Sequence, residues 1–201
     1  MQASEQISVF DMFKIGVGPS SSHTLGPWRA AQQFVQSLTE NGHFEKVAGI
    51  RILLYGSLAK TGKGHGTDIA VLLGLSGEDP VTVDVSQIDA KVKLILSAKK
   101  ISLGGAKPID YSDDDMLFLM AETLPFHPNG LTFQALLDDG TAVSETYYSI
   151  GGGFVVKEGE TNLQKTEVDL PFPIDNAAEL LHWCRKTGLK VSEVVMENEQ
   201  A

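Results

Sequence analysis

Two stretches decide the fold, Leu131-Thr-Phe-Gln-Ala-Leu-Leu137 and Ala142-Val-Ser-Glu-Thr-Tyr-Tyr148, with Asp138-Asp139-Gly140 between them. Both have the length of a strand and are rich in aliphatic, aromatic and β-branched residues. Asp-Gly is favoured in tight hairpin turns because glycine adopts positive φ without a steric penalty. The sequence therefore predicts an antiparallel hairpin at this point.

Further strands and helices are expected on both sides of this hairpin. Strands are predicted at residues 50–55, 116–120 and 154–156, and helices at residues 8–13, 28–42, 67–75, 88–99, 176–187 and 193–199. Polar side chains precede three of the helices, and we expect caps at Ser86, Asp175 and Ser192. Together these elements predict an α+β fold in which helices cover one face of a mixed, mainly antiparallel sheet.

The composition narrows the function classes. The 201 residues carry 16 basic and 26 acidic side chains, for a net charge of −10, which argues against binding to nucleic acid or anionic lipid. Cys184 is the only cysteine, so an internal disulfide and a cysteine-rich zinc site are excluded. The start of the chain does not resemble a signal peptide, and no apolar run reaches the ~20 residues of a membrane span. We expect a cytoplasmic protein.

The first of three polar segments runs from Gly16 to Thr24 and ends with Ser20, Ser21, Ser22, His23 and Thr24, just before a predicted helix. Free N–H groups and the helix dipole make such a position suitable for a carboxylate or a phosphate. The alternative is that the serines and the threonine only cap the helix.

The second segment, Gly56 to Thr67, holds four glycines, two lysines and His65. It does not match a phosphate-binding loop, because five residues separate Gly56 from Gly62 and a glycine follows Lys63. We expect a flexible backbone that presents His65 at a helix N-terminus, where the imidazole would stay neutral and act as a base. The alternatives are a surface histidine in a mobile loop and a phosphate- or nucleotide-binding protein.

The third segment places His127 and Asn129 between Pro125, Pro128 and Gly130. The prolines would hold both side chains in a defined turn, although Asn-Gly is also common in turns without a function. Further on, Ser149 and residues 151–153 could offer backbone N–H groups to an oxyanion or could form a β-bulge.

Five ordered blocks of this sequence resemble the iron–sulfur L-serine dehydratases of bacteria. They are Ser8-Val-Phe-Asp-Met-Phe-Lys-Ile-Gly-Val-Gly-Pro-Ser-Ser-Ser-His-Thr-Leu-Gly-Pro27, Tyr55-Gly-Ser-Leu58, Thr61-Gly-Lys-Gly-His-Gly-Thr-Asp68, Leu124-Pro-Phe-His-Pro-Asn-Gly130 and Thr146-Tyr-Tyr-Ser-Ile-Gly-Gly-Gly153. The resemblance covers nearly the whole chain. It implies that residues 1–201 are the N-terminal β domain of such an enzyme. Residues 190–201 would then begin the connection to a C-terminal α domain.

The resemblance implies an activity, a cofactor and partners. The family converts L-serine to pyruvate and ammonia without pyridoxal phosphate, using a [4Fe–4S] cluster held by cysteines of the α domain. The metal ligands would therefore lie outside this chain, and the chain alone would be inactive. We expect L-serine, the α domain or a separate α subunit, and a second copy of the protein as partners. The implied fold resembles the allosteric substrate-binding domain of some phosphoglycerate dehydrogenases.

The resemblance also assigns the site residues. His65 is the first candidate for the catalytic base and His127 the second. The implied substrate-binding residues are Ser20, Ser21, Ser22, His23, Thr24, Thr67, Asn129, Ser149 and Gly151. A domain that binds serine only to regulate another domain would share these motifs, so this alternative stays open.

Overall fold

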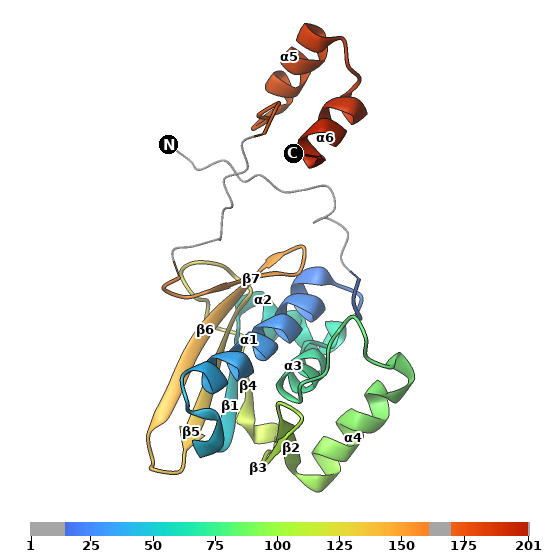
Figure 1. The fold of residues 1–201 in the computed structure, drawn as a ribbon. Coiled ribbons are helices and arrows are strands. Elements are labelled where there is room, and N and C mark those ends of the chain that lie inside the picture. Colours follow the sequence, from blue (N-terminus) through green and yellow to red (C-terminus); the bar gives the residue numbers. More distant parts are fainter. Residues whose placement is uncertain (1–14, 161–169, 201) are drawn as a thin grey trace. The chain divides into compact units, whose positions relative to one another are not determined.

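The computed structural model describes residues 15–160 and 170–200, which form two compact units (Figure 1). Residues 15–160 contain the whole sheet, and residues 170–200 contain two helices. The helix predicted at residues 8–13 lies outside the described residues. The assignment of residues 1–201 to a single domain stays a prediction.

The sheet is built around strand β1, Val47–Tyr55. Along the main path the strands follow the order β2-β3-β1-β5-β6-β7, and β4 also pairs with β1. The other strands are β2 (Lys100–Leu103), β3 (Lys107–Asp110), β4 (Met116–Leu119), β5 (Gly130–Leu137), β6 (Ala142–Gly151) and β7 (Phe154–Lys157). Strand β1 is parallel to β3 and β4, whereas the other pairs are antiparallel. The predicted α+β class with a mixed, mainly antiparallel sheet is confirmed.

The hairpin predicted from the sequence is β5–β6, which pairs from Gly130↔Tyr148 to Leu136↔Ala142. Gly140 has φ +82° in the turn, the left-handed conformation that glycine adopts without strain. The turn thus sets the register of the two strands, and that register fixes which side chains face the helices.

Four helices accompany the sheet in the unit formed by residues 15–160: α1 (Gly26–Glu40), α2 (Gly56–His65), α3 (Thr67–Leu75) and α4 (Ile88–Ala98). Helices α1 and α3 pack against each other, and α1 also packs on β6 and β7 (Figure 1). Three of these helices were predicted, and α4 begins at Ile88 as expected. The predicted cap at Ser86 was wrong, because Gln87 precedes α4 and makes no side-chain cap bond. Asp84 instead caps the short turn Val85–Gln87 ahead of α4, where its side chain accepts the backbone N–H of Ser86.

The second unit contains α5 (Ala177–Thr187) and α6 (Val191–Glu199). Both helices were predicted, but both predicted caps were wrong. Asn176 caps α5, because its side-chain oxygen accepts the N–H groups of Ala178 and Glu179, one residue after the expected Asp175. Helix α6 begins at Val191, so Ser192 lies inside its first turn.

The largest difference from the sequence prediction is at residues 56–65, where helix α2 replaces the expected flexible backbone. Gly56 has φ +50°, so the chain turns directly from β1 into the helix, and a Cβ there would lie 2.5 Å from the Pro128 carbonyl oxygen. Gly66, with φ +67°, ends α2 and opens α3. The glycines therefore form the boundaries of a helix. Strands β2 and β3 were also missed, because each is short and has polar residues at half of its four positions.

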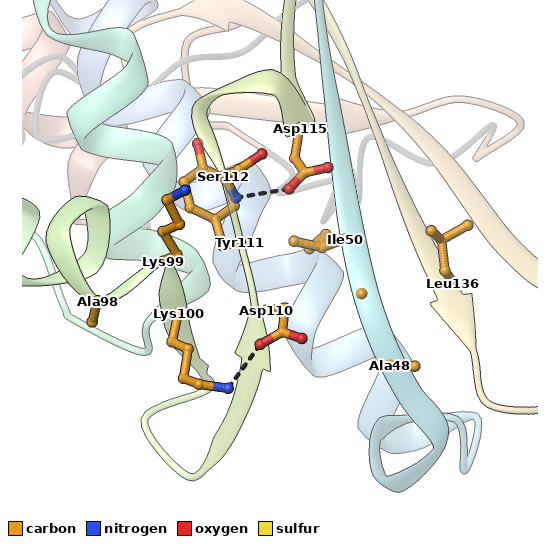
Figure 2. A pocket seen from close by; sticks show the side chains of 11 residues that line it. Ala48, Ile50, Ala98, Lys99, Lys100, Asp110, Tyr111, Ser112, Asp115 and Leu136 are labelled. Carbon is orange, nitrogen blue, oxygen red and sulfur yellow. Dashed lines mark hydrogen bonds and ion pairs between the residues drawn. The ribbon is translucent and has the colours of Figure 1, made fainter.

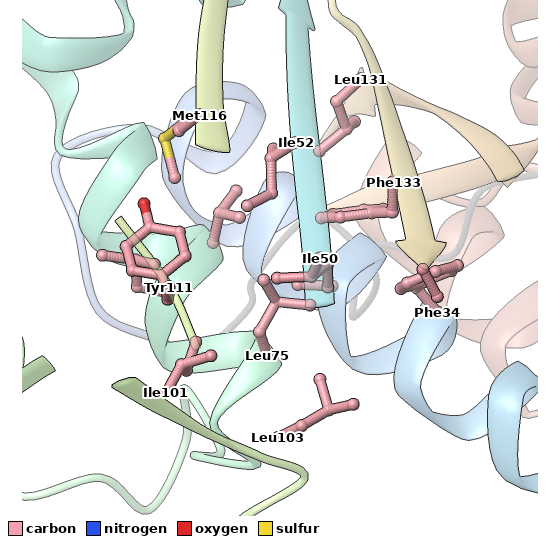
Figure 3. Close-up of a cluster of buried hydrophobic side chains, with 14 of the residues drawn as sticks. Phe34, Ile50, Ile52, Leu75, Ile101, Leu103, Tyr111, Met116, Leu131 and Phe133 are labelled. Carbon is pink, nitrogen blue, oxygen red and sulfur yellow. The ribbon is translucent and has the colours of Figure 1, made fainter. Parts of the chain in front are cut away.

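The hydrophobic core lies between the sheet and its helices (Figure 3). Ile50, Ile52 and Leu54 alternate along β1 and are buried, as expected for one covered face of a sheet. Phe133 on β5 lies opposite Ile52 and stacks on Phe34 of α1 with 5.1 Å between ring centroids. The aromatic stack thus joins α1 to the centre of the sheet.

Across residues 15–160 and 170–200, every helix is too short or too polar to cross a membrane.

The contact between α1 and α3 gives the first prediction. A Cβ added at Gly74 of α3 would lie 2.5 Å from the Trp28 carbonyl oxygen, whereas one added at Gly64 of α2 would meet no atom within 4 Å. We predict that Gly74→Ala lowers the free energy of unfolding by about 1–3 kcal/mol through overpacking. Gly64→Ala, the matched control, should raise it by about 0.5–1 kcal/mol. Urea denaturation of both variants checks this, and a stable Gly74→Ala protein would contradict the close packing.

Candidate functional site

The three polar segments predicted from the sequence meet near the C-terminal end of β1. The first forms a π-helical turn, Ser21–Leu25, that leads into α1 and is capped by Ser20. The second is the junction of α2 and α3 around His65 and Thr67. The third is the turn before β5, which contains His127 and Asn129. Hydrogen bonds join all three.

Two threonines tie the first segment to the second reciprocally. The Thr24 hydroxyl donates to the His65 carbonyl oxygen at 2.9 Å, and the Thr67 hydroxyl donates to the His23 carbonyl oxygen at 2.5 Å. Thr67 is completely buried and Thr24 is 5% exposed. A buried hydroxyl needs a partner, and each threonine finds it in the backbone of a histidine. The two bonds therefore hold the backbones of His23 and His65 side by side.

Ser149 and Asn129 add the third segment and β6 to this arrangement. The buried Ser149 hydroxyl donates to the Ser22 carbonyl oxygen at 2.7 Å, and the Asn129 side-chain amide donates to the Ser149 carbonyl oxygen at 3.1 Å. A Cβ at Gly26 would lie 1.9 Å from the Ser149 hydroxyl oxygen, so this contact requires a glycine there. The start of α1 is thereby fixed against β6.

Both ring nitrogens of His23 have hydroxyl partners. Nδ1 lies 2.9 Å from the Ser22 hydroxyl and Nε2 lies 3.0 Å from the Ser57 hydroxyl. Burial lowers the pKa of His23, the His65 imidazole lowers it further, and a hydrogen bond with the Ser57 backbone acts in the opposite direction. His23 is therefore neutral at pH 7, and in a neutral imidazole one nitrogen donates while the other accepts.

The ring of His65 lies beside that of His23, with 5.0 Å between the centroids. Its Nδ1 is 3.0 Å from the Thr61 carbonyl oxygen, which can only accept, so Nδ1 carries the hydrogen. In the neutral ring, Nε2 then has a free lone pair. The sequence predicted His65 at a helix N-terminus. In the structure His65 is the last residue of α2, and it lies two positions before the first residue of α3. The Thr61 carbonyl, and not a helix N-terminus, therefore determines that Nε2 is the nitrogen that can accept a proton.

His127 differs from His65 in which nitrogen is engaged. Its Nδ1 lies 3.1 Å from the backbone nitrogen of Asn129, whose N–H donates to it, so a neutral ring carries its hydrogen on Nε2. The lone pair of His127 is thus already in use, which makes it less suited than His65 to take up a proton.

The remaining predicted residues, Ser20, Ser21 and Gly151, are half-buried or exposed. Ser21 is exposed, and Ser20 accepts the backbone N–H of His23 at 3.2 Å. Gly151 has φ +101° and lies where the register of β6 and β7 shifts, as expected for the β-bulge considered from the sequence. The assignment of these residues to substrate binding stays a prediction.

Sequence reasoning missed Ser57 and Thr61. Ser57 contacts His23 through its side chain, and Thr61 contacts His65 through its carbonyl group. Residues 56–65 were predicted to be irregular, so the spacing of four residues between Thr61 and His65 did not indicate a contact between them. A helix prediction there would have revealed it, since residues four apart lie on one helix face.

A hollow of about 520 Å³ lies at the opposite end of β1, beside Ala48 and Ile50 (Figure 2). Its charged groups include Lys100 and Asp110, which pair with each other at 2.7 Å. Burial, followed by the nearby Asp113 and Asp115, raises the pKa of Tyr111, so its hydroxyl stays protonated. None of the site residues predicted from the sequence lines this hollow.

The residues of this chain do not fit an iron–sulfur cluster. Such a cluster normally needs three or four thiolates, and the chain has only Cys184, on α5. Among the described residues, no three His, Cys, Asp or Glu side chains are grouped so that they could hold a metal ion.

The buried threonine bonds give the second prediction. Thr67→Val keeps the side-chain shape but leaves the His23 carbonyl oxygen without its buried donor, so the free energy of unfolding should fall by about 1–3 kcal/mol. Thr39 on α1 is the matched control, because its exposed hydroxyl also donates to a carbonyl, that of Val35 at 3.1 Å. Thr39→Val should change stability by less than about 0.5 kcal/mol. Equal effects in urea denaturation would contradict the special role of the buried bond.

Comparison with known proteins agrees with the resemblance of the five blocks. The chain is 48% identical over 200 residues to an L-serine dehydratase of Streptomyces coelicolor, covering 97% of this chain and 44% of that protein. It is 43% identical over 197 residues to L-serine dehydratase 1 of Escherichia coli and 41% identical over 198 residues to an L-serine dehydratase of Haemophilus influenzae. Each match covers 97% of this chain, and 43% and 44% of the respective relatives. The chain thus spans less than half the length of these relatives. Residues 8–160 match the family described as serine dehydratase beta chain, and the chain belongs to that family.

Proposed function

We propose that this chain forms the substrate-binding and proton-accepting part of an L-serine dehydratase, which converts L-serine to pyruvate and ammonia. The observation that carries this proposal is the state of His65. Its Nδ1 is bound to the Thr61 carbonyl, so the lone pair is on Nε2, which has no hydrogen-bond partner among the described residues. The ring is half-buried beside a second, neutral imidazole. A nitrogen with an available lone pair is suited to general base catalysis.

The dehydration needs a base because the α-hydrogen of serine leaves as a proton. In the proposed step, Nε2 of His65 takes the α-proton, and the electron pair of the C–H bond becomes part of the new C=C bond. The hydroxyl group then leaves the β-carbon, and the aminoacrylate product tautomerises to an imine, which one water molecule hydrolyses to pyruvate and ammonia. The departure of hydroxide needs an electrophile, which the residues of this chain do not provide.

The substrate carboxylate requires hydrogen-bond donors close to the base. The turn at Ser20–Thr24 and the start of α2 supply hydroxyl groups on the side of His23, and His23 lies directly beside His65. The positive end of the α2 dipole adds a modest attraction for an anion. These features support a site for an α-amino acid carboxylate, although the whole protein has a negative net charge.

The proposal extends to groups outside this chain. A [4Fe–4S] cluster would supply the electrophile when bound, held by a C-terminal α domain or α subunit, and the complete enzyme would be a cytoplasmic homodimer that uses no pyridoxal phosphate. The support is the resemblance to the family together with the single thiol of this chain. The chain alone should therefore release no pyruvate after anaerobic treatment with iron and sulfide.

The phosphate-binding alternative loses its structural basis. Residues 56–65 form a helix, whereas a phosphate-binding loop wraps its backbone N–H groups around the ligand before the helix begins. A regulatory serine-binding module remains the alternative, and it requires the same cluster of residues without proton transfer. Kinetics separates the two roles.

The third prediction concerns His65 in the complete dehydratase that contains this chain. His65→Ala should lower kcat by about 10²-fold or more and change KM much less, because proton transfer is lost while the substrate contacts remain. His182→Ala on α5 is the matched control and should retain full activity. A His65→Ala enzyme with near-normal kcat but altered dependence on L-serine would favour the regulatory role.

A further inference from the structure

The hydroxyl groups around His23 differ in the acceptors to which they donate their hydrogen bonds. Thr24, Thr67 and Ser149 donate to the carbonyl oxygens of His65, His23 and Ser22, respectively. Because a hydroxyl has one proton, none of these three can donate to a ligand without breaking a bond within the chain. They hold the loops in place, and the donors for a substrate must come from other groups.

A continuous chain of contacts connects the hydroxyls that remain. Ser20 Oγ lies 3.4 Å from Ser22 Oγ, Ser22 Oγ lies 2.9 Å from His23 Nδ1, and His23 Nε2 lies 3.0 Å from Ser57 Oγ. We call these four residues the serine–histidine chain. Since each hydroxyl has one proton and the neutral imidazole has one N–H, all the donors point the same way along it.

The direction of this chain decides which end has a free proton. Nε2–H is the intrinsically favoured form of a neutral histidine, and in that form His23 donates to Ser57 while Ser22 donates to Nδ1. Ser20 in turn donates to Ser22, and Ser20 Oγ itself accepts the backbone N–H of His23. The chain then runs from Ser20 to Ser57, and the Ser57 proton is not used within it.

The position of Ser57 suits a donor to an anion. Ser57 is the second residue of α2 and is half-buried, and its backbone N–H donates to the Pro128 carbonyl oxygen at 3.0 Å. Its hydroxyl oxygen is polarised by the N–H of a neighbouring imidazole, and its proton is at the positive end of a ten-residue helix.

From this arrangement we infer that Ser57 is a further substrate-binding residue, whose hydroxyl donates to the substrate carboxylate, and that His23 is a positioning residue that directs this donor. The inference rests on the proposed function, because it takes L-serine as the ligand. It also gives His23 a role other than direct contact with substrate, since both of its nitrogens are engaged within the chain.

The first part of the test needs no activity. Two-bond ¹H–¹⁵N correlation spectra of the 201-residue chain at pH 7.5 report which nitrogen of each histidine carries the hydrogen. We expect His23 in a single Nε2–H form, and a mixture of both forms in Ser57→Ala, which lacks the acceptor. Ser97→Ala on α4, whose exposed hydroxyl donates to the Leu94 carbonyl oxygen, should leave the His23 signals unchanged. A fixed Nδ1–H form in the unaltered chain would overturn the direction.

The second part uses the complete dehydratase with L-serine. Ser57→Ala should raise KM about tenfold or more with kcat within about twofold, as expected for a lost hydrogen bond to a charged group. Ser57→Thr keeps the hydroxyl and should restore most of the affinity, whereas a purely structural role would lower stability in both variants. An unchanged KM in Ser57→Ala would overturn the inference. If the unaltered enzyme shows no L-serine dehydratase activity, the proposed function fails, while the spectra still decide the hydrogen-bond direction.

Discussion

The candidate site depends on a reciprocal pair of hydrogen bonds between two turns that are far apart in the sequence. Thr24 donates to the carbonyl of His65, and Thr67 donates to the carbonyl of His23. Each bond leaves from one segment and ends on the backbone of the histidine in the other, so the two imidazoles are kept 5.0 Å apart at their centroids. Because these bonds are buried, breaking one would leave a polar group without a partner and would lower the stability of the fold. The neutral state of His23 and the open nitrogen of His65 both follow from the geometry that they impose.

The fold brings the residues of the candidate site together at the C-terminal end of β1. The strand ends at Tyr55 and α2 begins at the next residue, so Ser57 and His65 lie on a helix that starts at the sheet. The β5–β6 hairpin brings Asn129 and Ser149 to the same end, since Gly130 pairs with Tyr148. The hydrophobic core under α1 and α3 then keeps the first turn of α1 in contact with β6. A rigid scaffold thus carries a site made mainly of turns and helix ends.

Much of this could be predicted from the sequence, and the failures have physical reasons. Periodicity and turn residues located the β5–β6 hairpin, α1 and α3, because those segments bury one regular face. Helix α2 was missed because glycine has low intrinsic helix propensity, yet close packing against the Pro128 carbonyl requires a glycine at position 56, where the helix begins. Motifs identified His23, His65, Thr67 and Ser149. Only the structure shows that the hydroxyl groups of Thr67 and Ser149 donate to backbone carbonyl oxygens. Ser57 lay in one of the five blocks that resemble the family but was assigned no role, because its role depends on a contact 34 residues away.

The central claim is that this chain binds L-serine at the histidines and hydroxyls near the C-terminal end of β1. The most direct measurement is an NMR titration of the ¹⁵N-labelled 201-residue chain with L-serine, with L-serinamide, which lacks the carboxylate, as the control. We predict saturable changes in the amide signals of residues 20–24, 57 and 65–67 with L-serine, and much smaller changes with the amide. No change at these residues, or changes confined to the hollow around Lys99 and Tyr111, would contradict the account.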